Sequence, residues 1–180
     1  MKLGLGTGST AAFFVDLVGE KVAEGLDVLC VPTSSVTKAQ AEALGIPLTT
    51  LDEIRHLDLV VDGADEFDAA LNLIKGGGGA LLQEKLVATA ATQMIVISDD
   101  SKQVDTLGAF PLPVEVVRFG WETTQVKILN IINHANVGGM DITRRMAGDE
   151  PFVTDEGHYI LDLHLKTIDE PRSEDRRVGN

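Results

Sequence analysis

The sequence predicts an α/β fold, in which a doubly wound, mostly parallel Rossmann-like sheet is followed by a smaller α+β domain. Through about the first hundred residues, short β-branched runs alternate with stretches whose apolar residues recur at helical spacing, a pattern typical of a parallel sheet with helices on its faces. After residue 114 the strand-like segments follow one another with turn residues between them. That second pattern is typical of antiparallel pairing.

The first domain is expected at residues 1–114. Strands are predicted at residues 2–5, 27–31, 58–61 and 94–97, and helices at residues 9–24, 35–44 and 80–91. In a sheet of this kind, ligands bind beyond the carboxyl ends of the strands. Three of the polar or glycine-rich clusters directly follow predicted strands, so we expect them to share one edge of the sheet.

The second domain is expected at residues 115–168 and looks incomplete. Two prolines at positions 111 and 113 indicate a connector that enters an edge strand. A helix is then predicted at residues 121–134, and strands at residues 140–146 and 152–165, the second of these a hairpin bent at residues 155–157. Residues 169–180 are nearly all polar or charged, which predicts a disordered tail.

Charge and composition exclude several classes of function. The 180 residues carry a formal net charge of −13, which disfavours nucleic acid as a partner because its phosphates attract basic surfaces. No stretch approaches the roughly 18 consecutive apolar residues of a membrane span, and the first residues show no signal-peptide pattern. Cys30 is the single cysteine, so no internal disulfide can form and a cytoplasmic location is expected.

The most informative segment is a run of four glycines, residues 76–79, between Lys75 and Glu84. Glycine loses more backbone entropy on folding than any other residue, so such a run indicates a place where backbone N–H groups approach a ligand closely. Lys75 supplies a positive charge, and Glu84 is a candidate base in a predicted helix. A flexible turn flanked by a solvated lysine and glutamate is the alternative interpretation.

A second glycine-rich segment, Gly4-Leu-Gly-Thr-Gly-Ser-Thr-Ala-Ala, follows the first predicted strand. Its small residues, its hydroxyl groups and the N-terminus of the next helix together favour phosphate binding. The segment lacks the full glycine spacing of the dinucleotide fingerprint, and Pro32-Thr-Ser-Ser stands where an acidic residue would end the second strand. A nicotinamide dehydrogenase is therefore not predicted, and a tight turn with a serine helix cap remains an alternative.

Two carboxylates, Asp62 and Asp65, follow the third predicted strand in the segment Asp62-Gly-Ala-Asp-Glu. At the ligand edge they could accept hydrogen bonds from sugar hydroxyls, or one of them could donate a proton. A magnesium site is a competing interpretation, but no histidine or third carboxylate has suitable spacing, so no metal is expected. An aspartate turn with a helix cap is the structural alternative.

A third cluster, Ser98-Asp-Asp-Ser-Lys, ends in Lys102. This lysine is placed to neutralise a phosphate, although a capping turn with a solvated lysine explains the same residues. No ligand or triad spacing relates the four histidines, and we expect surface or packing roles for His56, His134, His158 and His164.

Five ordered motifs resemble the ribose-5-phosphate isomerase type A family. They are Gly4-Leu-Gly-Thr-Gly-Ser-Thr-Ala, Val61-Asp-Gly-Ala-Asp-Glu, Lys75-Gly-Gly-Gly-Gly-Ala, Glu84-Lys85 and Ser101-Lys-Gln-Val-Asp. Phe110-Pro-Leu-Pro-Val-Glu-Val extends the resemblance, which runs from residue 2 to about residue 166. It implies an aldose–ketose isomerase of the pentose phosphate pathway that interconverts D-ribose 5-phosphate and D-ribulose 5-phosphate without metal or organic cofactor. It also implies a homodimer or homotetramer.

The resemblance implies a role for each matched residue. Glu84 would be the general base that moves a proton between carbons 1 and 2, Asp62 would assist opening of the furanose ring, and Lys75 would help backbone amides stabilise the enediolate oxygen. The implied substrate-binding residues are Thr7, Gly8, Ser9, Thr10, Asp62, Gly63, Ala64, Asp65, Lys75, Gly76, Gly77, Gly78 and Lys102. The phosphate is expected among Ser9, Thr10 and Lys102. A carboxylate base agrees with the chemistry, because a proton beside a carbonyl is only weakly acidic.

The chain departs from the family pattern at both ends. Family members carry a helix before the first strand and further helix and strand segments after the position of Leu165, so this chain looks truncated. Two other functions remain open. A sugar-phosphate-binding sensor module would not require Glu84 or the two aspartates, and an inactive isomerase fragment would keep the motifs without holding them in the geometry that catalysis needs.

Overall fold

The computed structural model describes residues 1–172, which form two compact units. Unit 1 comprises Met1–Gly63 and Ala80–Asp99, and unit 2 comprises Ala64–Gly79 and the chain from Asp100 onward. The domain boundary expected at residue 114 stays a prediction. Of the predicted disordered tail, residues 173–180 lie outside the described residues. In the part that is described, the Asp169 N–H donates to the Asn136 carbonyl at 3.2 Å.

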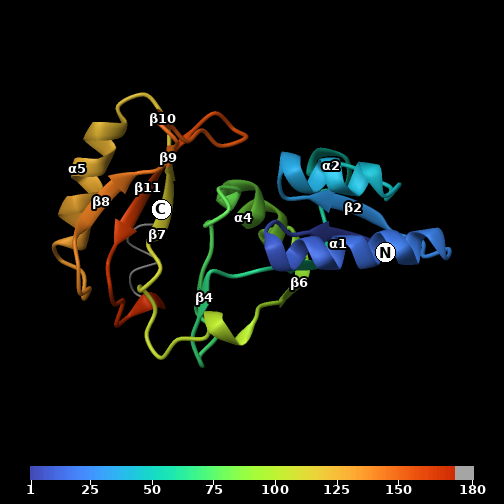
Figure 1. The fold of residues 1–180 in the computed structure, drawn as a ribbon, viewed down its shortest axis with the longest axis horizontal. Helices are drawn as coiled ribbons and strands as arrows, with labels where there is room; N and C mark the ends of the chain where they lie inside the picture. Colours follow the sequence, from blue (N-terminus) through green and yellow to red (C-terminus); the bar gives the residue numbers. More distant parts are fainter. Residues whose placement is uncertain (173–180) are drawn as a thin grey trace. The chain divides into compact units, whose positions relative to one another are not determined.

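A four-stranded parallel sheet forms the centre of unit 1 (Figure 1). Its strands, in spatial order, are β2 (Leu29–Pro32), β1 (Lys2–Leu5), β3 (Leu57–Asp62) and β6 (Ala91–Val96). All three neighbouring pairs are parallel, which confirms the predicted fold class. From β1 the chain first adds β2 on one side and later β3 on the other. The topological switch point therefore lies between β1 and β3, where sheets of this kind bind ligands.

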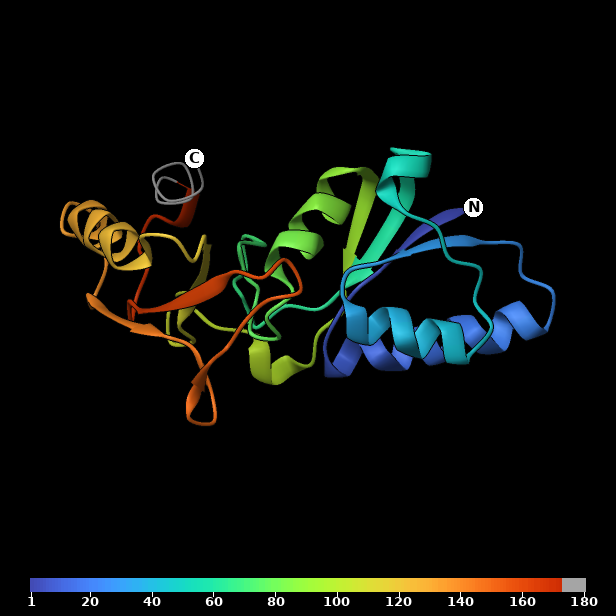
Figure 2. The same ribbon diagram turned by 90° about the horizontal axis from the view of Figure 1, so that it is seen from above.

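Helices cover both faces of this sheet. Figure 2 shows α1 and α2 on one face and α4 on the other. The helices of unit 1 are α1 (Ser9–Ala23), α2 (Ser35–Ala43), α3 (Leu51–Ile54) and α4 (Leu81–Thr89). Three of them match the predicted helices to within one or two residues at each end, whereas the single turn α3 was not predicted.

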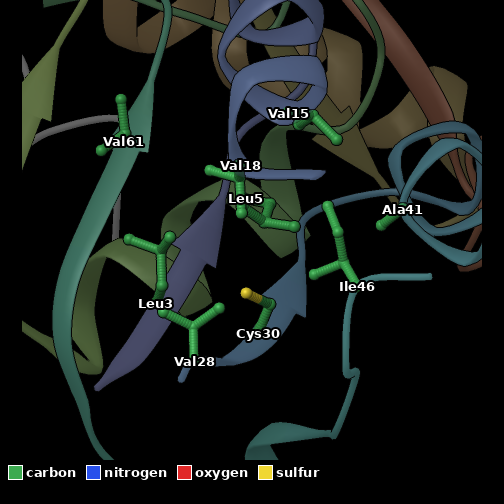
Figure 3. Packing of buried hydrophobic residues seen from close by; sticks show 9 residues of the cluster. All are labelled: Leu3, Leu5, Val15, Val18, Val28, Cys30, Ala41, Ile46 and Val61. Carbon is green, nitrogen blue, oxygen red and sulfur yellow. The ribbon is translucent and has the colours of Figure 1, made fainter. Parts of the chain in front are cut away.

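Successive side chains along each strand point to opposite faces of the sheet, so each face has its own apolar cluster. Val61 of β3 belongs to the apolar cluster under α1 and α2, and its neighbour Val60 packs with Val87 of α4 instead. Figure 3 shows the first cluster, in which Leu3 and Leu5 of β1 are almost completely buried. Burying each such side chain stabilises the fold by about 1.5–3 kcal/mol.

Cys30 lies in the cluster of Figure 3 with no exposed surface. Burial raises the pKa of its thiol from 9.0 to about 11, against a smaller lowering by the positively charged N-terminus. We expect no reaction with an aromatic disulfide reagent at pH 8 in the native protein and one reactive thiol after unfolding. Because the pKa of the thiol is higher in the folded protein than in the unfolded chain, the protonated thiol stabilises the folded state. This contribution to stability is complete below pH 9 and is lost as the pH rises toward 11.

Absorbance of the aromatic thiolate released from the reagent measures the reaction of Cys30. Denaturant unfolding at pH 8 and at pH 10.5 measures the loss of stability at high pH. A Cys30→Ala variant is the control, since it should lose less stability between the two pH values. Fast reaction of the native protein at pH 8 would contradict the buried, protonated state.

A three-stranded antiparallel sheet forms the core of unit 2, with strand order β7 (Leu112–Val116), β11 (Tyr159–His164) and β8 (Asp141–Arg144). Helix α5 (Trp121–Ile132) packs against this sheet through Ile128 and Ile132, which join Leu161 and Leu163 in one apolar cluster. The edge strand predicted at the two prolines is confirmed as β7, which begins after Pro111 and contains Pro113. The predicted helix at residues 121–134 is confirmed as α5.

Shorter elements complete unit 2. Two-stranded ladders join β4 (Glu66–Phe67) to β5 (Leu73–Ile74) and β9 (Met146–Ala147) to β10 (Glu150–Pro151), and η1 (Asp100–Lys102) is a turn of 3-10 helix. The predicted strand at residues 140–146 is interrupted at Arg145, which lies between β8 and β9.

The hairpin predicted at residues 152–165 is wrong. A turn does form at the expected place, where the Thr154 N–H donates to the His158 carbonyl and the Gly157 N–H to the Thr154 carbonyl. However, β11 pairs with β7 and β8, and the strand that precedes the turn, β10, lies outside the predicted hairpin and pairs with β9. Alternating apolar residues indicate a strand but do not select its partner, which is decided by packing across the whole unit.

Candidate active site

Asp62 joins the loop after β1 to the end of β3 in unit 1. Its Oδ1 atom accepts hydrogen bonds from the Gly63 N–H at 2.7 Å and the Thr7 N–H at 3.1 Å, and the residue is 1% exposed. Gly6 makes this approach possible, because a Cβ atom there would lie 2.2 Å from Asp62 Oδ1. The carboxylate is thus fixed at the switch point between β1 and β3.

A buried group of hydroxyls holds the same loop from the side of β2. Thr7 Oγ1 lies 2.7 Å from Thr33 Oγ1, 2.8 Å from Ser34 Oγ and 3.0 Å from Thr37 Oγ1. Thr37 also donates to the Gly6 carbonyl at 3.1 Å. The segment Pro32-Thr-Ser-Ser was noted in the sequence only because no acidic residue stands there. The available signal was four hydroxyl residues within the six that follow a predicted strand.

Helix α1 begins directly after this loop. Its N-cap is Gly8, with a φ of 119° that favours glycine, and no side chain caps its first turn. Ser9 is the first helical residue, so the alternative of a serine cap is wrong. The first turn also contains no acidic residue, and Ser9 is exposed. Its free amide groups and the helix dipole favour an anion at this position.

Glu84 lies in the first turn of α4 and is only 6% exposed. It shares its helix face with Val87, one turn later, which packs on Val60 of β3. Gly4 of β1 lets the helix approach this closely, because a Cβ atom there would lie 2.7 Å from side-chain atoms of both valines. Since α4 connects parallel strands, its N-terminus lies at their carboxyl ends, which is the edge that carries Asp62.

The glycine run belongs to unit 2, where Asp65 binds it. The Asp65 N–H donates to the Ile74 carbonyl at 2.8 Å, and Asp65 Oδ2 accepts from the Gly77 N–H at 2.7 Å. The predicted use of the Gly77 amide by an enediolate oxygen therefore requires this hydrogen bond to open. The hydrogen bond between Asp65 and Gly77 leaves the roles predicted for the Gly76 and Gly78 amides unchanged.

The run forms a packed turn. Gly76 and Gly79 have φ angles of +100° and +81°, and the Gly79 N–H donates to the Gly76 carbonyl at 3.0 Å. A Cβ atom at Gly79 would lie 2.5 Å from Cζ of Phe152. Close approach and positive φ thus account for the glycines in physical terms. The alternative of a solvated turn is wrong for Glu84, which is buried.

The predicted substrate-binding and catalytic residues are distributed over both units. Those in unit 1 are Thr7, Gly8, Ser9, Thr10, Asp62, Gly63 and Glu84, and those in unit 2 are Ala64, Asp65, Lys75, Gly76, Gly77, Gly78 and Lys102. Lys75 precedes the glycine run and Lys102 ends η1, and both are half-buried. Their assembly into one substrate site stays a prediction.

Three charged residues of unit 2 with well-defined contacts were missed. Glu66 is buried and accepts from the Gly108 and Phe110 amides at 2.8 and 2.5 Å. Arg145 forms an ion pair with Asp162, and its Nη1 atom also donates to the Gly76 carbonyl in the glycine run. A signal existed for Asp162, since a lone carboxylate inside an apolar strand needs a partner. None existed for Arg145.

Two classes of site are absent from the described part of the chain. Residues 1–172 contain no group of three or more His, Cys, Asp or Glu side chains arranged to hold a metal ion. In the same residues, every helix is too short or too polar to cross a membrane.

Comparison with known proteins places these observations in a family. The family model described as "Ribose 5-phosphate isomerase A (phosphoriboisomerase A)" matches residues 29–180. A curated ribose-5-phosphate isomerase A of Cereibacter sphaeroides (strain ATCC 17029 / ATH 2.4.9) is 60% identical over 173 residues, which cover 96% of this chain and 66% of that protein. The chain thus spans slightly less than two thirds of that relative.

Solved structures give the same result. A D-ribose-5-phosphate isomerase in complex with phospho-erythronic acid superposes with a TM-score of 0.90 at 40% identity, over 99% of this chain and 77% of the other. The ribose 5-phosphate isomerase A of Methanocaldococcus jannaschii gives a TM-score of 0.89 at 38% identity, over 100% of this chain and 78% of the other. The chain belongs to the ribose 5-phosphate isomerase A family.

Proposed function

We propose that this chain is an aldose–ketose isomerase that interconverts D-ribose 5-phosphate and D-ribulose 5-phosphate through an enediolate. One observation carries the proposal beyond family membership. Glu84 is a buried carboxylate at the same edge of the sheet as the fixed carboxylate of Asp62. A buried carboxylate of this kind is suited to a general base that removes a weakly acidic proton beside a carbonyl.

The predicted catalytic residues Asp62, Glu84 and Lys75 have different roles in this reaction. Asp62, held by two backbone amides, assists opening of the furanose ring, and Glu84 then moves the proton between carbons 1 and 2. Lys75 and backbone amides of the glycine run stabilise the enediolate oxygen, and donors of this kind are worth about 3 kcal/mol each in comparable sites. The uncapped N-terminus of α1 binds the phosphate.

A direct assay tests the proposal. The purified chain is incubated with ribose 5-phosphate, and formation of the ketose is followed by its absorbance. Turnover well above that of the Glu84→Gln variant is the expected result. A folded chain that binds the sugar phosphate without turnover would favour a sensor module, and one that neither binds nor turns over would favour an inactive fragment. The names of the relatives support neither alternative.

Lys102 is proposed to contact the phosphate. Replacing it with alanine removes one charge-assisted hydrogen bond, so the KM for ribose 5-phosphate should rise about tenfold or more while kcat changes little. The control is Lys38→Ala, since Lys38 is an exposed lysine of α2 with a side chain 60% exposed. An unchanged KM in the Lys102→Ala variant would remove this lysine from the phosphate site.

We also propose that the chain acts in the cytoplasm as a homodimer or homotetramer. The single buried thiol of Cys30 suits a reducing compartment. Phe13 and Leu17, one turn apart on α1, are 73% and 56% exposed, and such an apolar face is suited to contact with a second copy. Light scattering coupled to size-exclusion chromatography measures the assembly, and a monomer at micromolar concentration would contradict it.

A further inference from the structure

One guanidinium group holds the glycine run of unit 2. Arg145 Nη1 donates to the carbonyl oxygens of Gly76 and Gly77 at 2.9 and 3.0 Å. Its Nε and Nη2 atoms donate to the two carboxylate oxygens of Asp162 at 2.9 and 2.5 Å. The two charged side chains are only 16% and 15% exposed. A bidentate pair of this kind has a fixed geometry, so the donor that faces the glycines is itself held in place.

Two successive carbonyls bound to one nitrogen set the direction of two N–H groups. In a trans peptide the C=O and N–H bonds point in opposite directions, and no described peptide bond is cis. With its carbonyl on Arg145, the Gly76–Gly77 peptide turns the Gly77 N–H away from the guanidinium, and this N–H binds Asp65. The next peptide likewise turns the Gly78 N–H away from Arg145.

Such a restraint matters more here than in an ordinary loop. Glycine adopts positive and negative φ angles about equally well, so peptides within a run of glycines can change orientation at little cost. Arg145 and Asp65 bind the Gly76–Gly77 peptide from its two opposite ends. This arrangement selects one orientation of the run from several that the sequence would allow.

The neighbouring arginine has a different environment. Consecutive side chains near a strand point to opposite faces of the sheet. Arg144 pairs with Leu161 in the ladder, and its Cζ lies 4.6 Å from the ring centre of Trp121, the first residue of α5. Arg145 lies on the opposite face with Asp162. The two arginines carry the same charge at adjacent positions, but only Arg145 contacts the glycine run.

We propose that Arg145, held by Asp162, is a positioning residue for the isomerase reaction, and the proposal rests on the function proposed above. It fixes the Gly76–Gly77 and Gly77–Gly78 peptides, so that the Gly78 amide has one orientation before the substrate reacts. Negative charge on the enediolate oxygen develops only during the reaction, and donors that need no reorientation at that moment stabilise it most. Arg145 acts through the backbone and does not contact the substrate.

The test compares Arg145→Met with Arg144→Met. Both variants lose one positive charge, but only the first loses the donors to the glycine run. We expect kcat of Arg145→Met to fall about tenfold to hundredfold, as when a reacting group loses its orientation, with the KM for ribose 5-phosphate changed less than kcat. Arg145→Lys should recover only part of the loss, because an ammonium cannot reproduce the planar fork. Arg144→Met should retain kcat.

Hydrogen exchange of the peptide that covers residues 73–80 gives a readout that does not depend on activity. Exchange should become faster in Arg145→Met and remain unchanged in Arg144→Met. Should Arg145→Met unfold at the assay temperature, Asp162→Asn gives the same test, because it keeps the side-chain shape but removes the charge and one of the two oxygens that hold the guanidinium. Unchanged exchange, or faster exchange with full kcat, would overturn the positioning role. A wild-type chain without turnover overturns the proposed function instead, and the exchange measurement still tests the restraint.

Discussion

Replacing Glu84 with glutamine is expected to lower kcat about a hundredfold or more, while binding of the sugar phosphate is largely retained. Glutamine has nearly the same shape and fits the same place in the first turn of α4, but it cannot accept the proton. Because Glu84 is buried on the face that packs against the sheet, water has little access to replace it as a base. The loss should therefore appear in kcat far more than in KM.

Steady-state kinetics with ribose 5-phosphate measure the loss, and calorimetric titration of the variant with the same sugar phosphate measures binding. The matched control is Glu122→Gln, which removes the same charge from the first turn of α5 at an exposed position. This control should retain both kcat and binding. A Glu84→Gln variant that turns over nearly as fast as the wild type would show that another group is the base.

The sheet and helices of unit 1 could be predicted because their signals are local. Each strand is a short apolar run, and each long helix repeats its apolar residues over at least two turns, so a window of about a dozen residues suffices. The alternation of strand and helix then favours parallel pairing without any knowledge of contacts. The short turn α3 carries too few residues for such a pattern, which explains why it was missed.

Unit 2 could be predicted only in part, because its pairings join distant segments. The ladder of β4 and β5 has two residues in each strand, too few for a visible alternation. Strand β11 lies between its partners β7 and β8. Nothing in the residues of β11 shows that it pairs with these strands rather than with the segment just before the turn. Strand partners are chosen by packing of the complete unit.

The candidate site shows the same division. Motifs of small and charged residues located the loop after β1, Asp62, the glycine run and Glu84, because their composition is unusual for a packed chain. The residues that hold these motifs in place lie in segments of ordinary composition. Thr37 and Arg145 do so through hydrogen bonds to the backbone, and such bonds use side chains that are common on any protein surface. A single sequence gives no reason to select Arg145, and for Thr37 it offers only the hydroxyl residues that gather after a predicted strand.

Gly6→Ala is expected to produce the second large effect, a loss of both stability and activity. A Cβ atom at this position would lie 2.2 Å from Asp62 Oδ1 and 2.5 Å from Asp62 Cα. The loop cannot withdraw, because the Gly6 N–H donates to the Val61 carbonyl and the Gly6 carbonyl accepts from Thr37. Overpacking of this kind costs about 1–3 kcal/mol or more, which corresponds to a fall in Tm of about 2–12 °C in a chain of this size.

The loss of activity has a separate cause, since the added methyl group displaces the carboxylate that is expected to open the sugar ring. Gly63→Ala is the control for stability, because a Cβ atom there would meet only the Ile97 carbonyl at the ordinary distance of 3.7 Å. Thermal unfolding should place Gly63→Ala close to the wild type and Gly6→Ala well below it. If both variants unfold at the wild-type temperature, the loop after β1 is free to move away from β3. A fixed Asp62 at the switch point would then be wrong, and with it the ring-opening role that depends on its position.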